Sequence, residues 1–112
     1  VMSWIGQTDV PVHLMRYEEM LTNPLEAFGA AVRFIGWDYD AARLERAMRD
    51  SSFEAMQAQE RERGFREKPP GMTTFFRKGK AGSWREELDA SQVERILRDH
   101  GTVMRRLGYL EE

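Results

Sequence analysis

The stretch VPVHLMRY, from Val10 to Tyr17, decides the fold class because its pattern is typical of a β-strand. It is short, apolar and rich in β-forming residues, and the residues around Pro11 mark a turn at its start. We therefore predict one buried strand here. A single strand cannot pair its own backbone N–H and C=O groups, so its neighbours must come from residues outside this sequence or from another chain.

Beyond this strand the pattern is mainly helical. Residues 22–37 predict a helix with Asn23 as its cap and Glu26 closing a capping box. A stripe of apolar residues runs along it, and Gly36 ends it. A second helix is predicted from Asp40 to Asp50.

The segment SSFEAM, from Ser51 to Met56, predicts the start of a third helix because Ser51 and Glu54 have the spacing of a capping box. Two hydroxyls at a helix N-terminus, where backbone N–H groups are unpaired, can also seat a phosphate. A plain cap is the commoner role of serine at this position. On the sequence alone, both the cap and the phosphate seat stay open.

The second half of the chain contains a loop and a final helix. Residues 59–74, QERERGFREKPPGMTT, combine alternating charges with two prolines and two glycines, and predict a solvated, mobile loop. Residues 88–110 predict an amphipathic helix that Asp89 and Gln92 box at its start and that Gly108 ends.

Length and composition narrow the classes of protein. The chain has 112 residues, about the size of one small domain, and contains no cysteine, which excludes a disulfide framework and a thiolate metal site. No apolar run approaches the ~20 residues of a membrane span, and no signal peptide precedes the first apolar pattern. We expect a cytoplasmic protein with no membrane partner. Because structured sequence already begins at Val1, we also expect a fragment of a larger domain.

The net charge of −2 hides an uneven distribution. Residues 1–60 hold 5 Arg and Lys against 10 Asp and Glu, whereas residues 61–85 hold 8 against 2. Nucleic-acid binders usually spread their basic charge over a whole face. A single basic segment in an acidic protein suits a small anionic ligand better, so we expect no nucleic-acid partner.

At the centre of the basic segment lies FFRKGKAGSW, from Phe75 to Trp84. Arg77 offers a planar fork of donors for phosphate oxygens, and Lys78 adds a point charge. Gly79 and Gly82 permit positive φ and a close approach of the backbone to an anion. The Walker A pattern GxxxxGK[ST] is absent. A clamp for an anion attached to a ring and a solvated basic loop with aromatic anchors both stay open from this spacing.

Catalytic machinery is not apparent in the sequence. His13 lies in the predicted strand and His100 on the predicted last helix, and neither has a carboxylate partner at a fixed spacing. The HExxH pattern is absent, and no nucleophile can be matched with a base. We predict no catalytic residue and no metal site in this chain.

Taken in order, RYEEM (residues 16–20), SSFEAM and FFRKGKAGSW resemble the C-terminal half of the cytosolic-type sulfotransferase family, with a bacterial-like compactness. The last motif of that family reads roughly RKGxxGDWK, and this chain has RKGKAGSWR. The resemblance extends from about Val10 to Gly108. It implies an α/β fold with the parallel sheet of P-loop proteins, in which residues 1–112 form the C-terminal part of a single domain. This part is expected to be mostly α-helical with one or two strands.

Members of that family transfer a sulfuryl group from 3′-phosphoadenosine-5′-phosphosulfate (PAPS) to a hydroxyl or amine and release 3′-phosphoadenosine-5′-phosphate (PAP). The resemblance implies that Arg77, Lys78 and Gly79 hold the 3′-phosphate, and that Tyr17 meets the adenine from the end of its strand. This agrees with the position of ligands beyond the carboxyl ends of strands in open α/β sheets. The resemblance further implies a nucleotide pocket lined at the start of the third helix by Ser51, Ser52, Phe53 and Met56.

The family pattern is also incomplete here. Its 5′-phosphosulfate loop and its catalytic histidine belong to the N-terminal part and match no residue of this sequence, so we expect this chain alone to be inactive. Ser83 and Arg85 stand where the family has Asp and Lys. Asp89 and Ala90 stand where its dimer motif has Thr and Val, so we expect any homodimer to use a different contact.

The resemblance implies an acceptor that is a small molecule or a natural product, with residues 59–74 as a candidate lid over it. The rival hypothesis is a non-catalytic helical module whose basic loop grips a phosphorylated partner or nucleic acid. A phosphate loop encoded upstream of Val1 would favour the enzyme, and a start codon directly before Val1 would favour the module.

Overall fold

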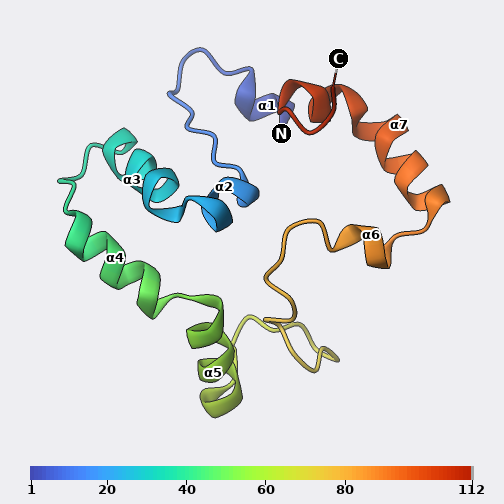
Figure 1. Ribbon diagram of the computed structural model, residues 1–112. Coiled ribbons are helices and arrows are strands. Elements are labelled where there is room, and N and C mark those ends of the chain that lie inside the picture. The colour runs from blue at the N-terminus through green and yellow to red at the C-terminus, as the bar shows by residue number, and fades with distance from the viewer. Residues whose placement is uncertain (112) are drawn as a thin grey trace. The chain divides into compact units, whose positions relative to one another are not determined.

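The computed structural model describes residues 1–111 as helices joined by turns and irregular segments (Figure 1). The chain divides into two compact units, one of residues 13–81 and one of residues 1–12 with the C-terminal residues from Gly82 onward. Each unit is described by itself. The helices are α1 (Met2–Ile5), α2 (Tyr17–Thr22), α3 (Pro24–Phe34), α4 (Ala41–Asp50), α5 (Phe53–Arg63), α6 (Trp84–Glu87) and α7 (Ala90–Arg106).

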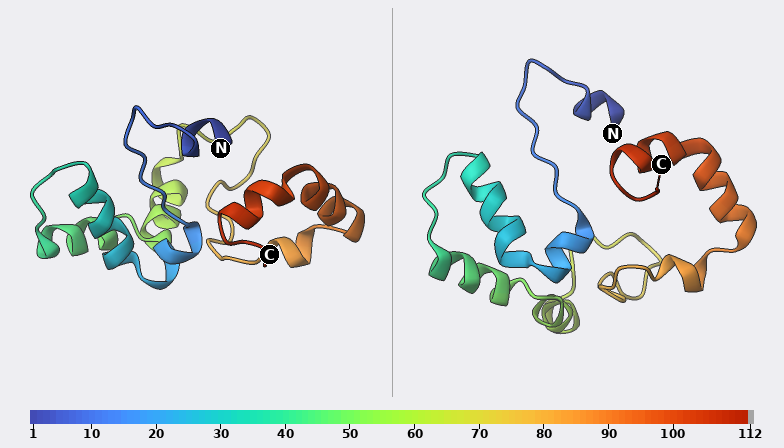
Figure 2. Two further views of the ribbon diagram at one scale, coloured as in Figure 1. Left: turned by 90° about the horizontal axis from the view of Figure 1, so that it is seen from above. Right: turned by 45° about the horizontal axis from the view of Figure 1, so that its top comes forward.

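In the unit of residues 13–81, α3 packs against both α2 and α4. The ring of Tyr39 lies so close to the buried Gly29 of α3 that a Cβ there would be 3.0 Å from it. The guanidinium of Arg33 covers the same ring at 4.7 Å from its centre. A small residue on α3 therefore lets the α3–α4 connection pack closely. α5 follows α4 after a short turn and runs in a different direction (Figure 2).

The strand predicted from Val10 to Tyr17 is absent from the described residues. Residues 11–16 form no regular element, and Tyr17 begins α2. Val10, Val12 and Leu14 are 55%, 42% and 51% exposed. A strand is stable only when its backbone groups pair with a neighbour, and residues 1–111 contain no second strand. The mostly helical character is thus confirmed for this part of the chain, whereas its one or two strands are not found.

The predicted helices are present, with corrections at their ends. Pro24 begins α3, but the side chain of Asn23 makes no capping hydrogen bond. Asn23 also closes α2, with φ −139° and ψ 63°, so it does not have the extended backbone of a usual N-cap. Asp40 caps α4 by accepting a hydrogen bond from the backbone N–H of Arg43 at 3.2 Å.

The other unit contains α1, α6 and α7. The predicted capping box of α7 is confirmed, because Asp89 and Gln92 each accept from the other's backbone N–H. Gly108 follows the end of α7 with φ +74°, as its predicted role requires. A guanidinium nitrogen of Arg106 donates to the carbonyl of Ile5 at 3.5 Å and so links α7 to α1.

Burial is shallow over the described part of the chain. No hydrophobic side chain of residues 1–111 is buried, and the buried charged residue among them is Glu60. No described helix has the length and apolar character needed to cross a bilayer. In the unit of residues 13–81, the enclosed side chain is therefore a charged one, that of Glu60.

Candidate functional site

The N-terminus of α5 is formed by two serines with different roles. Ser52 is its N-cap and accepts a hydrogen bond from the N–H of Ala55 at 3.2 Å. Ser51 instead closes α4 and donates its hydroxyl to the carbonyl of Ala47 at 2.7 Å. The predicted capping box from Ser51 is therefore wrong by one residue, because α4 continues to Asp50 and claims Ser51 for its own end.

One face of α5 carries residues that bind a later segment of the chain. Phe53, Gln57 and Glu60 share this face because four and three residues separate them. Gln57 donates through Nε2 to the carbonyl of Phe76 at 2.8 Å. Glu60 accepts from the backbone N–H of Phe75 at 2.8 Å and from that of Phe76 at 3.0 Å. α5 thus holds the backbone directly before the cationic residues 77–80.

Glu60 is enclosed, because only 8% of the residue is exposed. The hydrogen bond from the Phe75 N–H lowers the pKa of Glu60, helped by the bond from Phe76 and by the charge of Lys68 at 3.6 Å. Burial acts in the opposite direction but does not outweigh these contacts. The carboxylate therefore remains charged where it meets the backbone.

Four aromatic rings pack around this contact. Phe65 lies 4.6 Å from Phe75 and 5.0 Å from Phe76, between ring centres. Phe75 and Phe76 are 5.1 Å apart, and Phe53 meets Phe76 edge-on at 6.4 Å. These distances are those of favourable ring pairs. The two phenylalanines of FFRKGKAGSW therefore act as anchors for the basic segment.

Gly79 brings the basic segment onto the first residue of α5. Its φ is +58°, a value that favours glycine, and an added Cβ would lie 2.5 Å from Cδ2 of Phe53. A side chain at position 79 would collide with the ring. The structure therefore joins two predicted site motifs, SSFEAM and RKGKAG, through a direct contact of Gly79 with Phe53.

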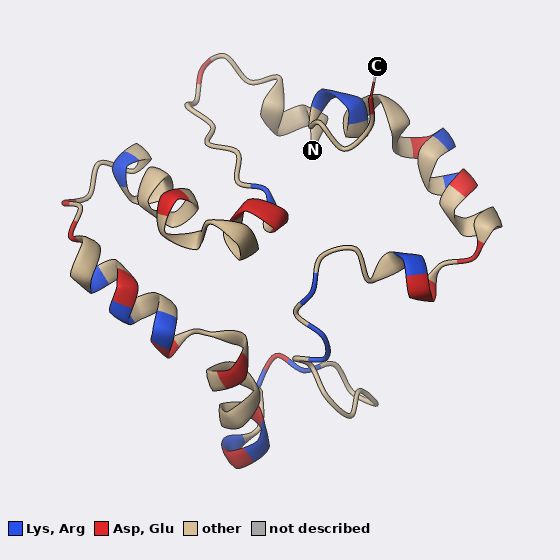
Figure 3. Ribbon diagram, viewed as in Figure 1, with Lys and Arg blue, Asp and Glu red and all other residues tan. Residues whose placement is uncertain are grey.

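The side chains beside this contact are cationic. Arg77, Lys78 and Lys80 are exposed. Figure 3 shows the blue of Lys and Arg on the segment that leads from α5 toward α6. The N-terminus of a helix also carries unpaired N–H groups and a partial positive charge. Cations and N–H groups of this kind can together hold an anion such as a phosphate.

Tyr17 and Met56 are among the six predicted site residues that are not part of the contact between Gly79 and Phe53. Tyr17 starts α2 and is 44% exposed, so its predicted position at the end of a strand is wrong. Met56 is half-buried on α5, three residues after Phe53. The nucleotide-binding roles of all eight predicted residues remain predictions.

The last three residues of RKGKAGSW, 82–84, belong to the other unit. Gly82 has φ +78°, and a Cβ there would lie 2.7 Å from Nη1 of Arg85. The guanidinium of Arg85 covers the ring of Trp84 at 4.6 Å from its centre. Arg85 and Trp84 thus form a local cation–π pair at the start of α6.

The loop predicted for residues 59–74 is shorter in the structure. Residues 59–63 are the last turn of α5, and the loop begins at Gly64. Lys68 crosses it by donating to the carbonyl of Thr73 at 3.1 Å while it pairs with Glu60. The alternating charges of residues 59–63 predicted a solvated loop. The helix continues through these residues instead, because glutamate and arginine are good helix formers.

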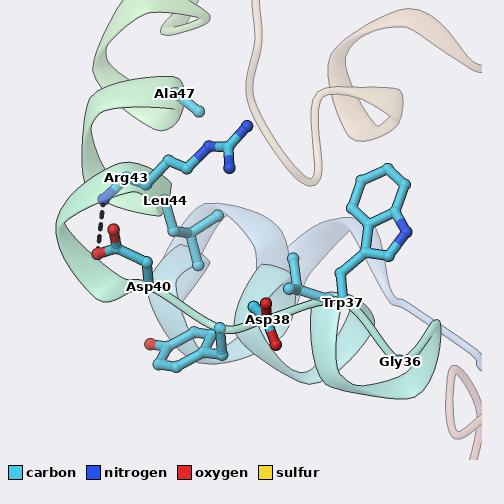
Figure 4. Close-up of a pocket in the computed structure, with 9 residues that line it drawn as sticks. Gly36, Trp37, Asp38, Asp40, Arg43, Leu44 and Ala47 are labelled. Carbon is cyan, nitrogen blue, oxygen red and sulfur yellow. Dashed lines mark hydrogen bonds between the residues drawn. The ribbon is translucent and has the colours of Figure 1, made fainter.

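A separate hollow of about 600 Å³ lies between α3 and α4 (Figure 4). Leu44 and Ala47 line it from α4, and Trp37 at its rim is 71% exposed. The carboxylate of Asp40 is engaged in capping α4 there. Residues 1–111 contain no group of three or more His, Asp or Glu that could hold a metal ion.

Sequence reasoning missed Gln57 and Glu60, the polar residues that hold the basic segment. Gln57 and Glu60 stand in a polar stretch, QAQERER, that has no apolar stripe. The pattern that could have found them is their spacing from Phe53, which puts an aromatic ring, an amide and a carboxylate on one face.

Residues 2–108 match the family model described as the sulfotransferase domain. The match includes α5 and the whole of FFRKGKAGSW. No curated protein and no solved structure matches the chain.

Proposed function

The chain belongs to the sulfotransferase domain family, and from this premise we propose that it takes part in sulfuryl transfer from PAPS to a hydroxyl or amine of a small-molecule or natural-product acceptor. In this proposal the complete domain has an α/β fold of the P-loop type. PAPS supplies the activated sulfuryl group, and this chain supplies the binding site for the 3′-phosphoadenosine part.

The observation that carries the proposal is the contact of Gly79 with Phe53. It sets the cationic segment against the N-terminus of α5, and both features favour a phosphate. Arg77 and Lys78 suit phosphate oxygens by charge and donor geometry, and the positive φ of Gly79 allows its backbone N–H to turn toward an anion. We assign the 3′-phosphate to these three residues.

The remaining assignments concern the nucleoside. We propose that Tyr17 meets the adenine. Phe53 has Gly79 against its ring, so its part is to fix the segment as well as to border the pocket. The rest of the proposed pocket is lined at the start of α5 by Ser51, Ser52 and Met56.

The test is calorimetric titration of the complete protein with PAP. Arg77→Ala should weaken binding about 10-fold to 100-fold, because hydrogen bonds to a charged group are lost. Arg46→Ala, which removes an exposed arginine of α4, is the matched control and should leave the affinity unchanged. Undiminished affinity in Arg77→Ala would refute the assignment of Arg77.

A second titration isolates the 3′-phosphate. Adenosine 5′-phosphate lacks this group, so it should bind more weakly than PAP to the unmodified protein. Arg77→Ala should reduce that difference without abolishing it, because Lys78 and Gly79 keep their proposed contacts with the 3′-phosphate. An unchanged difference in the variant would place Arg77 elsewhere in the site.

Family membership favours the enzyme over a non-catalytic module that grips a phosphorylated partner or nucleic acid. The two functions differ in what competes with PAP. A phosphoserine peptide or a short single-stranded oligonucleotide should not displace PAP from the enzyme. Displacement by either at a similar concentration would support the module.

A further inference from the structure

Glu60 is a buried carboxylate to which the proposed function gives no role. It lies on α5, two helical turns after Phe53, and 5% of its side chain is exposed. Removing a carboxylate from water is costly unless it is paired and hydrogen-bonded. Its place in the chain therefore needs an explanation beyond surface charge.

We propose that Glu60 is a positioning residue that fixes the phosphate-binding segment, residues 77–79, through the backbone of Phe75 and Phe76. The inference rests on the function proposed for that segment. Glu60 acts on the two residues directly before this segment, whose backbone N–H groups it binds.

The hydrogen bonds around Phe76 define the direction in which the chain enters the segment. Its N–H donates to Glu60 at 3.0 Å, and its carbonyl accepts from Gln57 at 2.8 Å. That carbonyl belongs to the peptide plane shared with Arg77, and peptide planes are rigid. The backbone at the start of Arg77 is therefore held by side chains of α5.

The carboxylate suits this position better than a neutral amide. Two backbone N–H groups point at its two oxygens, at 2.8 Å and 3.0 Å. An amide has one acceptor oxygen and would turn its NH2 group toward one of the two donors. One N–H would then lose its partner within a mostly enclosed site.

Lys68 completes the arrangement from the loop that begins at Gly64. Its ammonium lies 3.6 Å from Glu60 Oε1 and donates to the carbonyl of Thr73. It compensates the enclosed charge of Glu60 and links Glu60 to the backbone of the loop. Glu60 thus joins α5, this loop and the start of the basic segment.

The closing experiment uses Glu60→Gln in the complete protein, with Glu62→Gln as the matched control on the exposed side of the same helix. Amide hydrogen exchange at Phe75 and Phe76 measures, without any ligand, how firmly Glu60 holds their N–H groups; these two hydrogen bonds are called the clamp. Calorimetry with PAP measures the affinity of the phosphate-binding segment. Glu60→Gln should speed exchange at Phe75 or Phe76 at least about tenfold and weaken PAP binding about tenfold. Glu62→Gln should change neither quantity.

The conservative variant separates positioning from general destabilisation. Glu60→Asp keeps the charge but draws the oxygens back by one methylene, so it should recover part of the PAP affinity lost in Glu60→Gln. If neither variant folds, Gln57→Ala removes the bond to the Phe76 carbonyl and should weaken PAP binding a few-fold. Unchanged PAP affinity in folded Glu60→Gln, or in Gln57→Ala, would overturn the proposal.

Failure of the proposed function has a different outcome. If the unmodified protein binds no PAP, both that function and a role for Glu60 in nucleotide binding are refuted. Amide exchange would then still show whether Glu60 holds Phe75 and Phe76 in place. Equal exchange in the unmodified protein and Glu60→Gln would refute the clamp itself, whatever PAP does.

Discussion

Helices α5 and α7 begin in the same way but are held by different kinds of contact. In each, the side chain of the N-cap accepts a hydrogen bond from the N–H three residues later, at 3.2 Å for Ser52 and 2.9 Å for Asp89. The capping contacts of α7 all lie within its own first turn. The polar face of α5 instead bonds backbone groups 15 to 19 residues further along the chain.

The difference teaches which parts of the molecule depend on one another. The cap of α7 depends only on residues of its own first turn. The amide of Gln57 and the carboxylate of Glu60 contribute only when residues 75 and 76 are in place. We therefore expect α5 and the basic segment to order together, and α7 to be insensitive to changes in either.

The largest expected effect comes from Gly79→Ala, which disturbs the contact between the basic segment and Phe53 of α5. The left-handed backbone and the collision with Phe53 should together cost about 2–4 kcal/mol of unfolding free energy. Gly71→Ala is the control, since its φ of +84° carries the same conformational penalty while nothing lies within 4 Å of the added Cβ. Urea unfolding measures both. Equal losses in the two variants would show that the ring contact constrains nothing.

The pH dependence of Glu60 and Asp89 sharpens the comparison. The bond from the Phe75 N–H lowers the pKa of Glu60 below its ordinary 4.5, and the bond from the Gln92 N–H lowers the pKa of Asp89 below its ordinary 3.8. Each contribution to stability is thus present above the ordinary value and is lost as the pH falls through the lowered one. Carboxyl shifts measured by NMR against pH should show both pKa values below the ordinary ones.

The two carboxyls should then respond differently to Gly79→Ala. The pKa of Glu60 should rise toward 4.5, because its donors come from the displaced segment. The pKa of Asp89 should stay where it is, because its donors lie within α7. A shift in Asp89 of the same size would refute the independence of α7.

The same distinction explains how much the sequence could predict. The helix start at Asp89 was predicted because a capping box depends on residues three positions apart, and both of its hydrogen bonds are present. The cap at Ser52 was misplaced because the sequence cannot say whether Ser51 ends one helix or begins the next. The strand at Val10–Tyr17 was predicted from composition, but its existence depends on a pairing partner that residues 1–111 do not provide.

The candidate site follows the same rule. Gly79 was selected as a position of positive φ, which its sequence neighbours make recognisable, and the structure gives +58°. Its contact with Phe53 and the hydrogen bonds of Glu60 join residues 15 or more positions apart. Neither periodicity nor capping patterns carry information over that distance, so only the structure could supply them.

The smallest expected effect is a gain in stability from Gly101→Ala within α7. Gly101 is buried in the helix, yet an added Cβ would meet Arg105 at 3.8 Å and Leu110 at 4.0 Å, which are ordinary contacts. Alanine should therefore raise the unfolding free energy by about 0.5–1 kcal/mol, since it loses less backbone entropy than glycine on folding. Thermal unfolding and PAP titration measure the two consequences. Because the capping contacts of α7 lie within α7 itself, the affinity for PAP should not change. A loss of stability would contradict the entropy argument for Gly101, and a change in PAP affinity would show that α7 and the site depend on each other.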